Sequence, residues 1–267
     1  MVASDRLPFL VDRDVAARVE RLELGFNPYG IDPYGVSRTA VARAMTMLRW
    51  AYRSYFRVEV KGIEHVPEHG GAMIVGNHSG GVAVDAALLI GTCFYELEPP
   101  RLAQGMAEKF INRMPFGSLW SSRTGQFTGL PEQAVRLLRD GRLLMVFPEG
   151  ARGTAKLYWD RRSLVRFGTG FVRVAMQAGA PIVPVAILGG GEAIPTIFNA
   201  EWLGRLIGAP YLPVTPYLLP IPLPVKFRFL FGEPMRFDGD GTEDDEVIAE
   251  HVEVVRARIA QMIEEAA

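Results

Sequence analysis

A histidine and an aspartate lie on either side of a short, glycine-containing spacer in the stretch GNHSGGVAVD, residues 76–85. A carboxylate that holds an imidazole in one tautomer leaves the other ring nitrogen free to accept a proton from a hydroxyl group. His78 and Asp85 therefore predict a general base and its partner, which together make an alcohol oxygen nucleophilic. In the alternative interpretation, His78 is a polar turn residue and Asp85 only caps the following helix.

A second group of candidate residues follows the apolar run RLLMVF, in the motif FPEGAR. Glu149, Gly150 and Arg152 form a glycine-containing loop there. The planar guanidinium group of an arginine matches phosphate or carboxylate oxygens, so this loop predicts contact with a polar part of a substrate. Lys109 and Arg123 lie between the two motifs and are further cationic candidates.

Strand-like apolar runs alternate with helix-like segments around these motifs. Strands are expected over 72–76, 142–147, 181–188 and 225–234, and helices over 85–94, 130–141, 169–179 and from about residue 242. This alternation predicts an α/β fold with a largely parallel central sheet flanked by helices. Loops that follow parallel strands meet at one sheet edge. The two motifs should meet there with a third loop, LGGGE, which either lines a ligand or only turns the chain.

The segment 36–57 predicts an amphipathic helix. Val41, Met45 and Tyr52 fall on an apolar stripe, and residues 36–61 carry five arginines and one lysine against a single glutamate. A basic, aromatic-rich amphipathic helix is typical of membrane-surface contact, although packing on the core would explain the same stripe. We therefore divide the chain into an N-terminal helical membrane-association segment, 1–60, and a catalytic domain, 61–267.

Composition limits the classes of protein. The 267 residues have a formal net charge of −1, which argues against nucleic-acid binding through many phosphates. The start of the chain lacks the basic and apolar regions of a signal peptide, so we expect a protein on the cytoplasmic face of a membrane. Segment 206–225 is uncharged, but its six prolines exclude a continuous spanning helix. It is a loop that is either covered by protein or in contact with lipid.

Other chemistries fit the sequence poorly. His65 and His69 fall in a turn without metalloprotease context, and the single cysteine cannot form an intrachain disulfide or a cysteine-rich zinc site. Ser79 does not lie in a G-x-S-x-G motif, and no phosphate-binding loop is found. We expect neither a metal site nor another cofactor.

Taken together, NHxGG…D and FPEGxR resemble the motifs of the lysophospholipid and glycerolipid acyltransferase family. The resemblance runs from about Lys61 to Leu188 and includes Lys109 with Pro115 and Gly117, as well as APIVPVAI. The stretch from Trp159 to Glu192 is similar to the diacylglycerol acyltransferase branch. Four ordered blocks make this a specific signal, whereas any one of them would be weak.

The resemblance implies transfer of a fatty acyl group from coenzyme A or acyl carrier protein to a lipid hydroxyl, as in phospholipid biosynthesis. His78 would be the general base and Asp85 its partner. Glu149, Gly150 and Arg152 would bind the acceptor near its headgroup. A basic stretch at 136–173, with nine Lys/Arg and three Asp/Glu, would receive the phosphates of coenzyme A or an acidic carrier protein; a solvated face is the alternative.

Two departures from the family pattern bear on these roles. Six residues separate His78 from Asp85, where the family usually has four, so the loop must bulge, and Gly80 and Gly81 can permit this. Their backbone amides are also candidate oxyanion donors. Arg123 precedes the strand in which the family often places an arginine, so a neutral glyceride acceptor stays an alternative. Two other functions remain open: a catalytically silent lipid-binding module on the same scaffold, and a lipid ester hydrolase.

Overall fold

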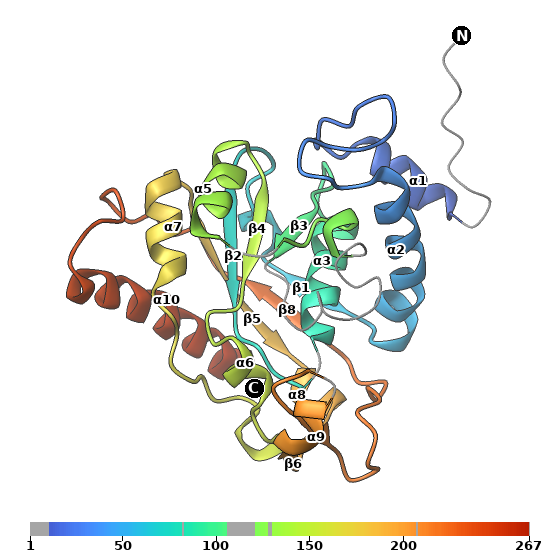
Figure 1. Ribbon diagram of the computed structural model, residues 1–267, viewed down its shortest axis with the longest axis vertical. Coiled ribbons are helices and arrows are strands. Elements are labelled where there is room, and N and C mark those ends of the chain that lie inside the picture. Colours follow the sequence, from blue (N-terminus) through green and yellow to red (C-terminus); the bar gives the residue numbers. More distant parts are fainter. Residues whose placement is uncertain (1–10, 82, 106–120, 128–129, 207, 267) are drawn as a thin grey trace.

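The computed structural model describes residues 11–81, 83–105, 121–127, 130–206 and 208–266. Its centre is a six-stranded sheet in the order β1-β8-β5-β2-β4-β3, with helices on both faces (Figure 1). The strands are β1 (Glu59–Lys61), β2 (Ala72–Gly76), β3 (Ala103–Gly105), β4 (Leu143–Val146), β5 (Ile182–Leu188) and β8 (Arg228–Phe231). β3, β4, β2 and β5 are parallel, and β8 runs antiparallel to β5. The predicted α/β class with a largely parallel sheet is confirmed.

The central strand β2 is buried along its whole length because both faces of the sheet are covered. Successive strand residues point to opposite faces. Ala72 and Ile74 accordingly belong to one hydrophobic core, while Met73 and Val75 belong to the other. An uninterrupted apolar run is therefore what this position in the fold requires.

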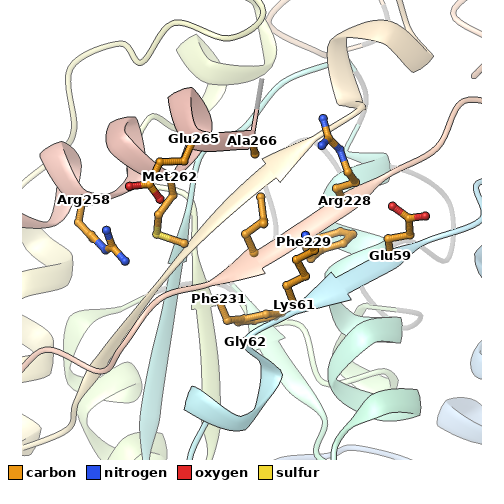
Figure 2. A pocket seen from close by; sticks show the side chains of 11 residues that line it. Glu59, Lys61, Gly62, Arg228, Phe229, Phe231, Arg258, Met262, Glu265 and Ala266 are labelled. Carbon is orange, nitrogen blue, oxygen red and sulfur yellow. The ribbon is translucent and has the colours of Figure 1, made fainter.

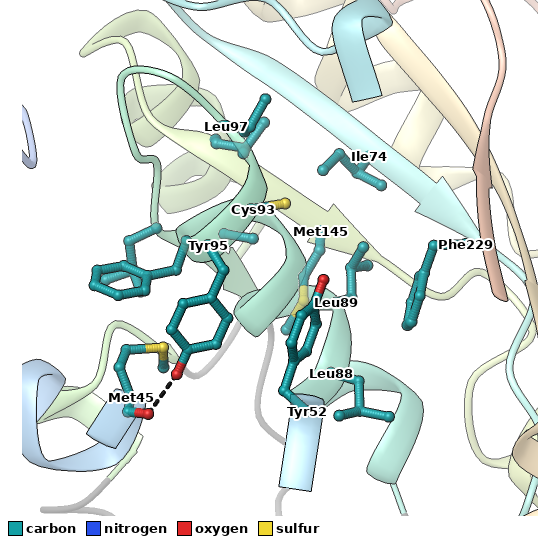
Figure 3. Packing of buried hydrophobic residues seen from close by; sticks show 14 of the residues in the cluster. Met45, Tyr52, Ile74, Leu88, Leu89, Cys93, Tyr95, Leu97, Met145 and Phe229 are labelled. Atoms are coloured by element: carbon teal, nitrogen blue, oxygen red, sulfur yellow. Dashed lines mark hydrogen bonds between the residues drawn. The ribbon is translucent and has the colours of Figure 1, made fainter. Parts of the chain in front are cut away.

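Three helices cover the first face: α1 (Arg13–Glu20), α2 (Arg38–Trp50) and α3 (Val84–Glu96). Tyr52 lies in the π-helical turn Ala51–Tyr55 that continues α2, and its side chain packs with Leu88 and Leu89 of α3 (Figure 3). Gly91 permits this close approach, since an added Cβ would lie 2.9 Å from Leu48 of α2. The predicted apolar stripe of this helix thus packs into the core.

The opposite face carries α5 (Pro131–Arg139), α7 (Gly170–Ala178) and the long C-terminal helix α10 (Asp245–Ala266) (Figure 1). Pro131 begins α5, where its missing N–H costs no helical hydrogen bond. Gly179 ends α7 in the left-handed region, at φ 63°, which a glycine adopts at little cost. These boundaries match the helices expected over 130–141 and 169–179.

A smaller layer lies at the carboxyl edge of the parallel strands. It contains the short helices α6 (Ala151–Thr154), α8 (Gly190–Ala193) and α9 (Glu201–Leu206), and the two-stranded sheet of β6 (Phe198–Ala200) and β7 (Leu212–Val214). Short 3₁₀ turns are formed by Ile63–His65 and Tyr158–Asp160. In Figure 1 this layer occupies the lower end of the molecule.

Residues 11–60 share a hydrophobic core with the rest of the described chain. Val15, Val41 and Tyr52 belong to the same buried cluster as Ile74 of the central strand. β1, at Glu59–Lys61, pairs with β8 near the other end of the sequence. Among the described residues, no helix is both long and apolar enough to cross a bilayer.

Candidate active site

Three loops follow neighbouring strands and meet at one edge of the sheet, as the sequence predicts. β2 pairs with β4 on one side and with β5 on the other, and all three strands run in the same direction. The chain segments that leave these strands begin at Asn77, Phe147 and Gly189. They form the candidate active site.

Asn77 fastens the first of these loops to β5. Backbone pairing between β2 and β5 ends at Gly76 and Val185. The Asn77 side chain continues it, because its Nδ2 donates to the carbonyl oxygen of Ile187 at 2.9 Å and its Oδ1 accepts from the Ile187 N–H at 2.7 Å. This frees the Asn77 backbone to turn away from the sheet toward His78.

We expect Asn77→Ala to lower the free energy of unfolding by about 2–4 kcal/mol, because it leaves two buried backbone groups of Ile187 without partners. Urea denaturation measures this loss. Asn199→Ala is a suitable control, because the Asn199 side chain donates one part-buried hydrogen bond, to Ala155. Equal and small losses in both variants would contradict the fastening role of Asn77.

His78 and Asp85 meet despite the long spacer between them. The His78 Nδ1 lies 2.7 Å from Asp85 Oδ2. The same carboxylate oxygen accepts the backbone N–H of Ser79 at 3.1 Å, and Oδ1 accepts that of Ala86 at 2.8 Å. Asp85 is fully buried in the first turn of α3, where the helix dipole favours a negative charge.

The bulge expected between these two residues is formed with glycines in left-handed conformations. Gly80 has φ 93° and Gly81 has φ 66°, values that side chains other than glycine rarely tolerate. Gly80 also lies against the third loop, where an added Cβ would come within 2.3 Å of the Gly190 carbonyl oxygen. The LGGGE loop thus reaches the site and packs on the histidine loop.

The His78 ring is fixed by Phe147, which stacks on one of its faces, and by Asp85, which contacts one of its nitrogens. Phe147, at the end of β4, stacks on it with ring centroids 4.3 Å apart and an interplanar angle of 19°. We assign the Nδ1 proton to the bond with Asp85, because a carboxylate can only accept. Nε2 then carries the lone pair, and it makes no hydrogen bond within the part of the chain that the structure describes. About a tenth of the side chain remains exposed.

Glu149 lies behind the histidine, and protein groups occupy both of its carboxylate oxygens. Oε1 accepts the backbone N–H of His78 at 2.8 Å, and Oε2 accepts that of Val165, also at 2.8 Å. The side chain is fully buried. Its contacts therefore join the histidine loop to the segment at Val165, and this geometry fits positioning better than contact with a substrate headgroup.

Lys156 completes this arrangement, and sequence reasoning did not single it out. Its Nζ lies 3.0 and 2.9 Å from the two carboxylate oxygens of Glu149, and it donates to the carbonyl oxygen of Ser163 at 2.9 Å. Only 3% of the side chain is exposed. In the sequence it is one of nine cations in the stretch 136–173, where nothing distinguishes a buried lysine from a solvated one.

Gly150 and Arg152 lie at the start of the short helix α6. Gly150 has φ 57° and ψ −150°, a region that is essentially restricted to glycine. Arg152 is exposed, and the one hydrogen bond of its side chain to the described residues is a long contact of 3.3 Å from Nη2 to the Arg166 carbonyl oxygen. The next residue, Gly153, packs directly on the histidine, since an added Cβ would lie 2.9 Å from His78 Cβ. Arg152 thus projects from a turn that is fixed against the histidine loop.

The two candidate oxyanion donors differ in their surroundings. The Gly81 N–H already donates to the Thr154 carbonyl oxygen at 2.9 Å. The Gly80 N–H has no acceptor among the described residues. Of the two amides, that of Gly80 is the one available to a ligand.

The structure does not bring all predicted cations into the site. Arg123 is exposed, its carbonyl oxygen accepts from the Ser37 N–H at the start of α2, and among the described residues no hydrogen bond or ion pair links its side chain to the three loops. Lys109, Pro115, Gly117 and Thr128 lie outside the described residues.

A cavity of about 430 Å³ lies away from this edge (Figure 2). It is lined by the edge strand β1, its neighbour β8 and the C-terminal end of α10, with Lys61, Arg228 and Arg258 around an apolar floor that includes Met262. None of its lining residues belongs to the three loops. This cavity is therefore not part of the candidate active site.

A buried His–Asp pair beside an FPEGAR turn, at the carboxyl edge of an α/β sheet, fits the acyltransferase that the sequence motifs predict, and the comparisons with known proteins show the family. A family model described as Acyltransferase matches residues 57–188. An uncharacterized protein of Mycobacterium tuberculosis is 35% identical over 252 residues, which cover 90% of this chain and 68% of that protein. The chain belongs to the acyltransferase family.

Two further proteins are similar. The human protein described as a DGAT1/2-independent enzyme synthesizing storage lipids is 28% identical over 196 residues, which cover 70% of this chain and 56% of that protein. The crystal structure of the 1-acyl-sn-glycerophosphate acyltransferase PlsC from Thermotoga maritima has a TM-score of 0.58 at 18% identity, and covers 86% of this chain and 81% of that one. The fold is thus that of PlsC, and the family model makes the chain an acyltransferase.

Proposed function

We propose that this protein transfers a fatty acyl group from an acyl thioester, acyl-CoA or acyl carrier protein, to a hydroxyl of a glycerolipid or lysophospholipid. The observation that carries the proposal is the 2.7 Å contact between His78 and the buried Asp85. It orients the imidazole so that its second nitrogen can accept a proton. The acyltransferase family of the chain supports the same reaction.

The reaction proceeds in one displacement with no metal or other cofactor. His78 Nε2 accepts the hydroxyl proton while the oxygen attacks the thioester carbonyl carbon. The tetrahedral oxyanion receives a hydrogen bond from the Gly80 amide. When the intermediate collapses, the carbon–sulfur bond breaks and the thiolate takes the proton from the imidazolium. Asp85 stabilises that imidazolium throughout.

A covalent acyl-cysteine is excluded from this scheme by the position of the sole cysteine. Cys93 is completely buried in α3, between the sheet and α2 (Figure 3). Burial raises the pKa of its thiol to about 12, so the nucleophilic thiolate is scarce at neutral pH. We therefore propose that the acceptor hydroxyl attacks the donor directly.

Arg152 provides the charge for the acceptor. Its guanidinium projects from a turn that packs on His78 and makes one long internal hydrogen bond, so most of its donors can bind phosphate or ester oxygens. We propose that Glu149 supports the site from behind, by fixing the histidine loop. The roles of Gly150, Lys109 and Arg123 stay predictions: a turn that shapes the headgroup site for Gly150, and weaker acceptor contacts for the other two.

Arg152→Ala is expected to raise the KM for the acceptor about tenfold or more, because a charge-assisted contact contributes roughly 1.5–3 kcal/mol, with a smaller change in kcat. Steady-state kinetics with varied acceptor measures both. Arg162→Ala is a control, since that exposed arginine lies in the same basic stretch but its nearest charged partner is Glu192. Unchanged acceptor KM in Arg152→Ala would remove its proposed role.

The test of the function is an assay of the purified protein with one labelled acyl thioester and a panel of acceptors: lysophosphatidate, a lysophospholipid, monoacylglycerol and diacylglycerol. Acyl transfer to at least one acceptor is expected. Neutral glycerides are included because the human relative is described as an enzyme synthesizing storage lipids. Absence of transfer to every acceptor of the panel would favour a silent lipid-binding module, and release of free fatty acid without an acceptor would favour a hydrolase.

We also propose that the protein works as a peripheral protein on the cytoplasmic face of a membrane. The arginines expected to form a basic face on the N-terminal helix are largely engaged internally: Arg49 pairs with Asp12 and Asp14, and Arg53 with Glu96. This helix leaves Arg43, Met47 and Trp50 exposed. The support for membrane contact from the described part of 1–60 is thus both apolar and electrostatic, and we assign the donor phosphates or carrier protein to the basic stretch at 136–173.

A further inference from the structure

Exposed apolar side chains are concentrated at the edge of the molecule that carries the site. We define the apolar rim as residues 158–159, 197–206 and 217–223. These ranges contain eleven of the seventeen large hydrophobic side chains that are exposed in the described structure, among them Trp202 at 62%, Leu206 at 76% and Leu218 at 74%. Soluble proteins rarely expose so many such side chains together, and a patch of this kind marks an interaction surface.

The rim is attached directly to the histidine loop. Pro213, in β7, lies so close to Gly81 that an added Cβ there would be 2.8 Å away. Tyr211 Oη donates to Thr154 Oγ1, and Asn199 Nδ2 donates to the Ala155 carbonyl oxygen at 2.6 Å. β7, which pairs with β6 of the rim, therefore connects the rim to the histidine loop.

The exposed tip of the rim is held in place by hydrogen bonds. Leu218 adopts a positive φ of 70°, which costs conformational energy in a residue other than glycine. The Thr215 hydroxyl donates to the Leu219 carbonyl oxygen at 2.9 Å, and the Leu218 N–H donates to the Thr215 carbonyl oxygen, also at 2.9 Å. A strained turn that presents leucines to solvent gains no burial in the free protein, so its benefit must come from a bound partner.

The rim continues onto the end of α2. Tyr55 Oη donates to the Pro222 carbonyl oxygen at 2.6 Å, and the ring of exposed Trp50 lies 5.4 Å from that of Tyr55. Arg57, whose Nη2 donates to the Pro224 carbonyl oxygen at 2.7 Å, and Arg205 on α9 are exposed at the border. The result is an apolar surface with tryptophans and arginines at its margin, a composition suited to the headgroup boundary of a bilayer.

We propose that the apolar rim is the surface that docks this protein on a phospholipid bilayer, with the tip at Leu218 and Leu219 inserted below the headgroups. A glycerolipid acceptor then reaches His78 from the membrane without its acyl chains crossing water. This part of the inference rests on the proposed function. Arg57 and Arg205 strengthen the contact with anionic lipids. The proposal thus places residues 217–223 of the uncharged segment 206–225 in contact with lipid.

The test is cosedimentation of the full chain with vesicles of phosphatidylcholine, with and without phosphatidylglycerol. The double variant Leu218→Asn/Leu219→Asn removes apolar surface without adding charge, and asparagine tolerates a positive φ. We expect its partition to fall about tenfold or more, since two large apolar side chains no longer enter the bilayer. Val254→Asn, an exposed apolar position on α10, is the matched control and should bind like the wild type.

Unchanged partition of the double variant, or an equal loss in Val254→Asn, would overturn the proposal. A concentration-dependent dimer that the double variant abolishes, with vesicle binding intact, would assign the rim to a second copy of the chain instead. Acyl transfer is measured separately with a monomeric short-chain acceptor. If acyl transfer is absent while vesicle binding depends on the rim, the proposed function is contradicted and the docking surface is supported. If acyl transfer is present while vesicle binding does not depend on the rim, the docking surface is contradicted and the proposed function is supported.

Discussion

Replacement of His78 by alanine is expected to lower kcat about 10²- to 10⁴-fold, which is the range that a positioned general base contributes. Nε2 of this imidazole has no hydrogen-bond partner among the described residues, while Nδ1 lies 2.7 Å from Asp85 Oδ2. Loss of the ring removes the proton acceptor and leaves the donor and acceptor sites in place. The KM values should therefore change far less than kcat.

The matched control is His69→Ala, because His69 is exposed and contacts only Glu23 among the described charged groups. It should retain wild-type turnover. Asp85→Asn is a second variant that keeps the shape of the buried side chain and still lowers kcat by losing the charge that stabilises the imidazolium. Wild-type turnover in folded His78→Ala protein would remove the mechanism, and normal circular dichroism melting establishes that the variant is folded.

Lys156→Met is expected to lower the free energy of unfolding by about 3–5 kcal/mol, because it leaves the Glu149 carboxylate buried without its cation. Four hydrogen bonds to that carboxylate connect Lys156, His78 and Val165. The variant should also lose kcat, since the histidine backbone is anchored to the same oxygen. Urea denaturation gives the first quantity and steady-state assay the second.

A double variant separates the charge from the shape. Glu149→Gln/Lys156→Met removes both charges and keeps an acceptor for the His78 amide, but it leaves the Val165 N–H without one, so it should regain part of the stability lost in the single variant. Lys226→Met is the control for an exposed pair: its partner Glu59 is half-exposed, and the expected loss is about 0–1 kcal/mol. Similar losses in Lys156→Met and Lys226→Met would contradict the positioning role.

The meeting of His78 with Asp85 could be predicted from the sequence because it depends on local features. A strand end, two glycines and a helix start fix where both side chains emerge, and parallel strands bring the FPEGAR loop to the same edge. The extra two residues of spacing are absorbed by the left-handed Gly80 and Gly81. The strands themselves were predictable because burial on both faces of the sheet demands uninterrupted apolar runs.

The direction of Glu149 and the burial of Lys156 could not be predicted, because they depend on contacts between segments. A carboxylate beside a substrate and a carboxylate behind a histidine have the same local sequence. What decides between them is a lysine seven residues away and the backbone of Val165. The ion pairs of the arginines in the N-terminal helical segment could not be predicted for the same reason, because their partners Asp12 and Glu96 lie in other parts of the chain.

The close approach of Gly80 to Gly190 limits how this enzyme can be redesigned. A methyl group at position 80 would have to displace the main chain at Gly190, and one at position 190 would come within 2.6 Å of the Ser79 hydroxyl oxygen. Mutant libraries aimed at new acceptors should therefore keep both positions fixed and diversify Arg152. Selection for altered specificity would then act on a side chain that can change shape without disrupting the turn that carries the base.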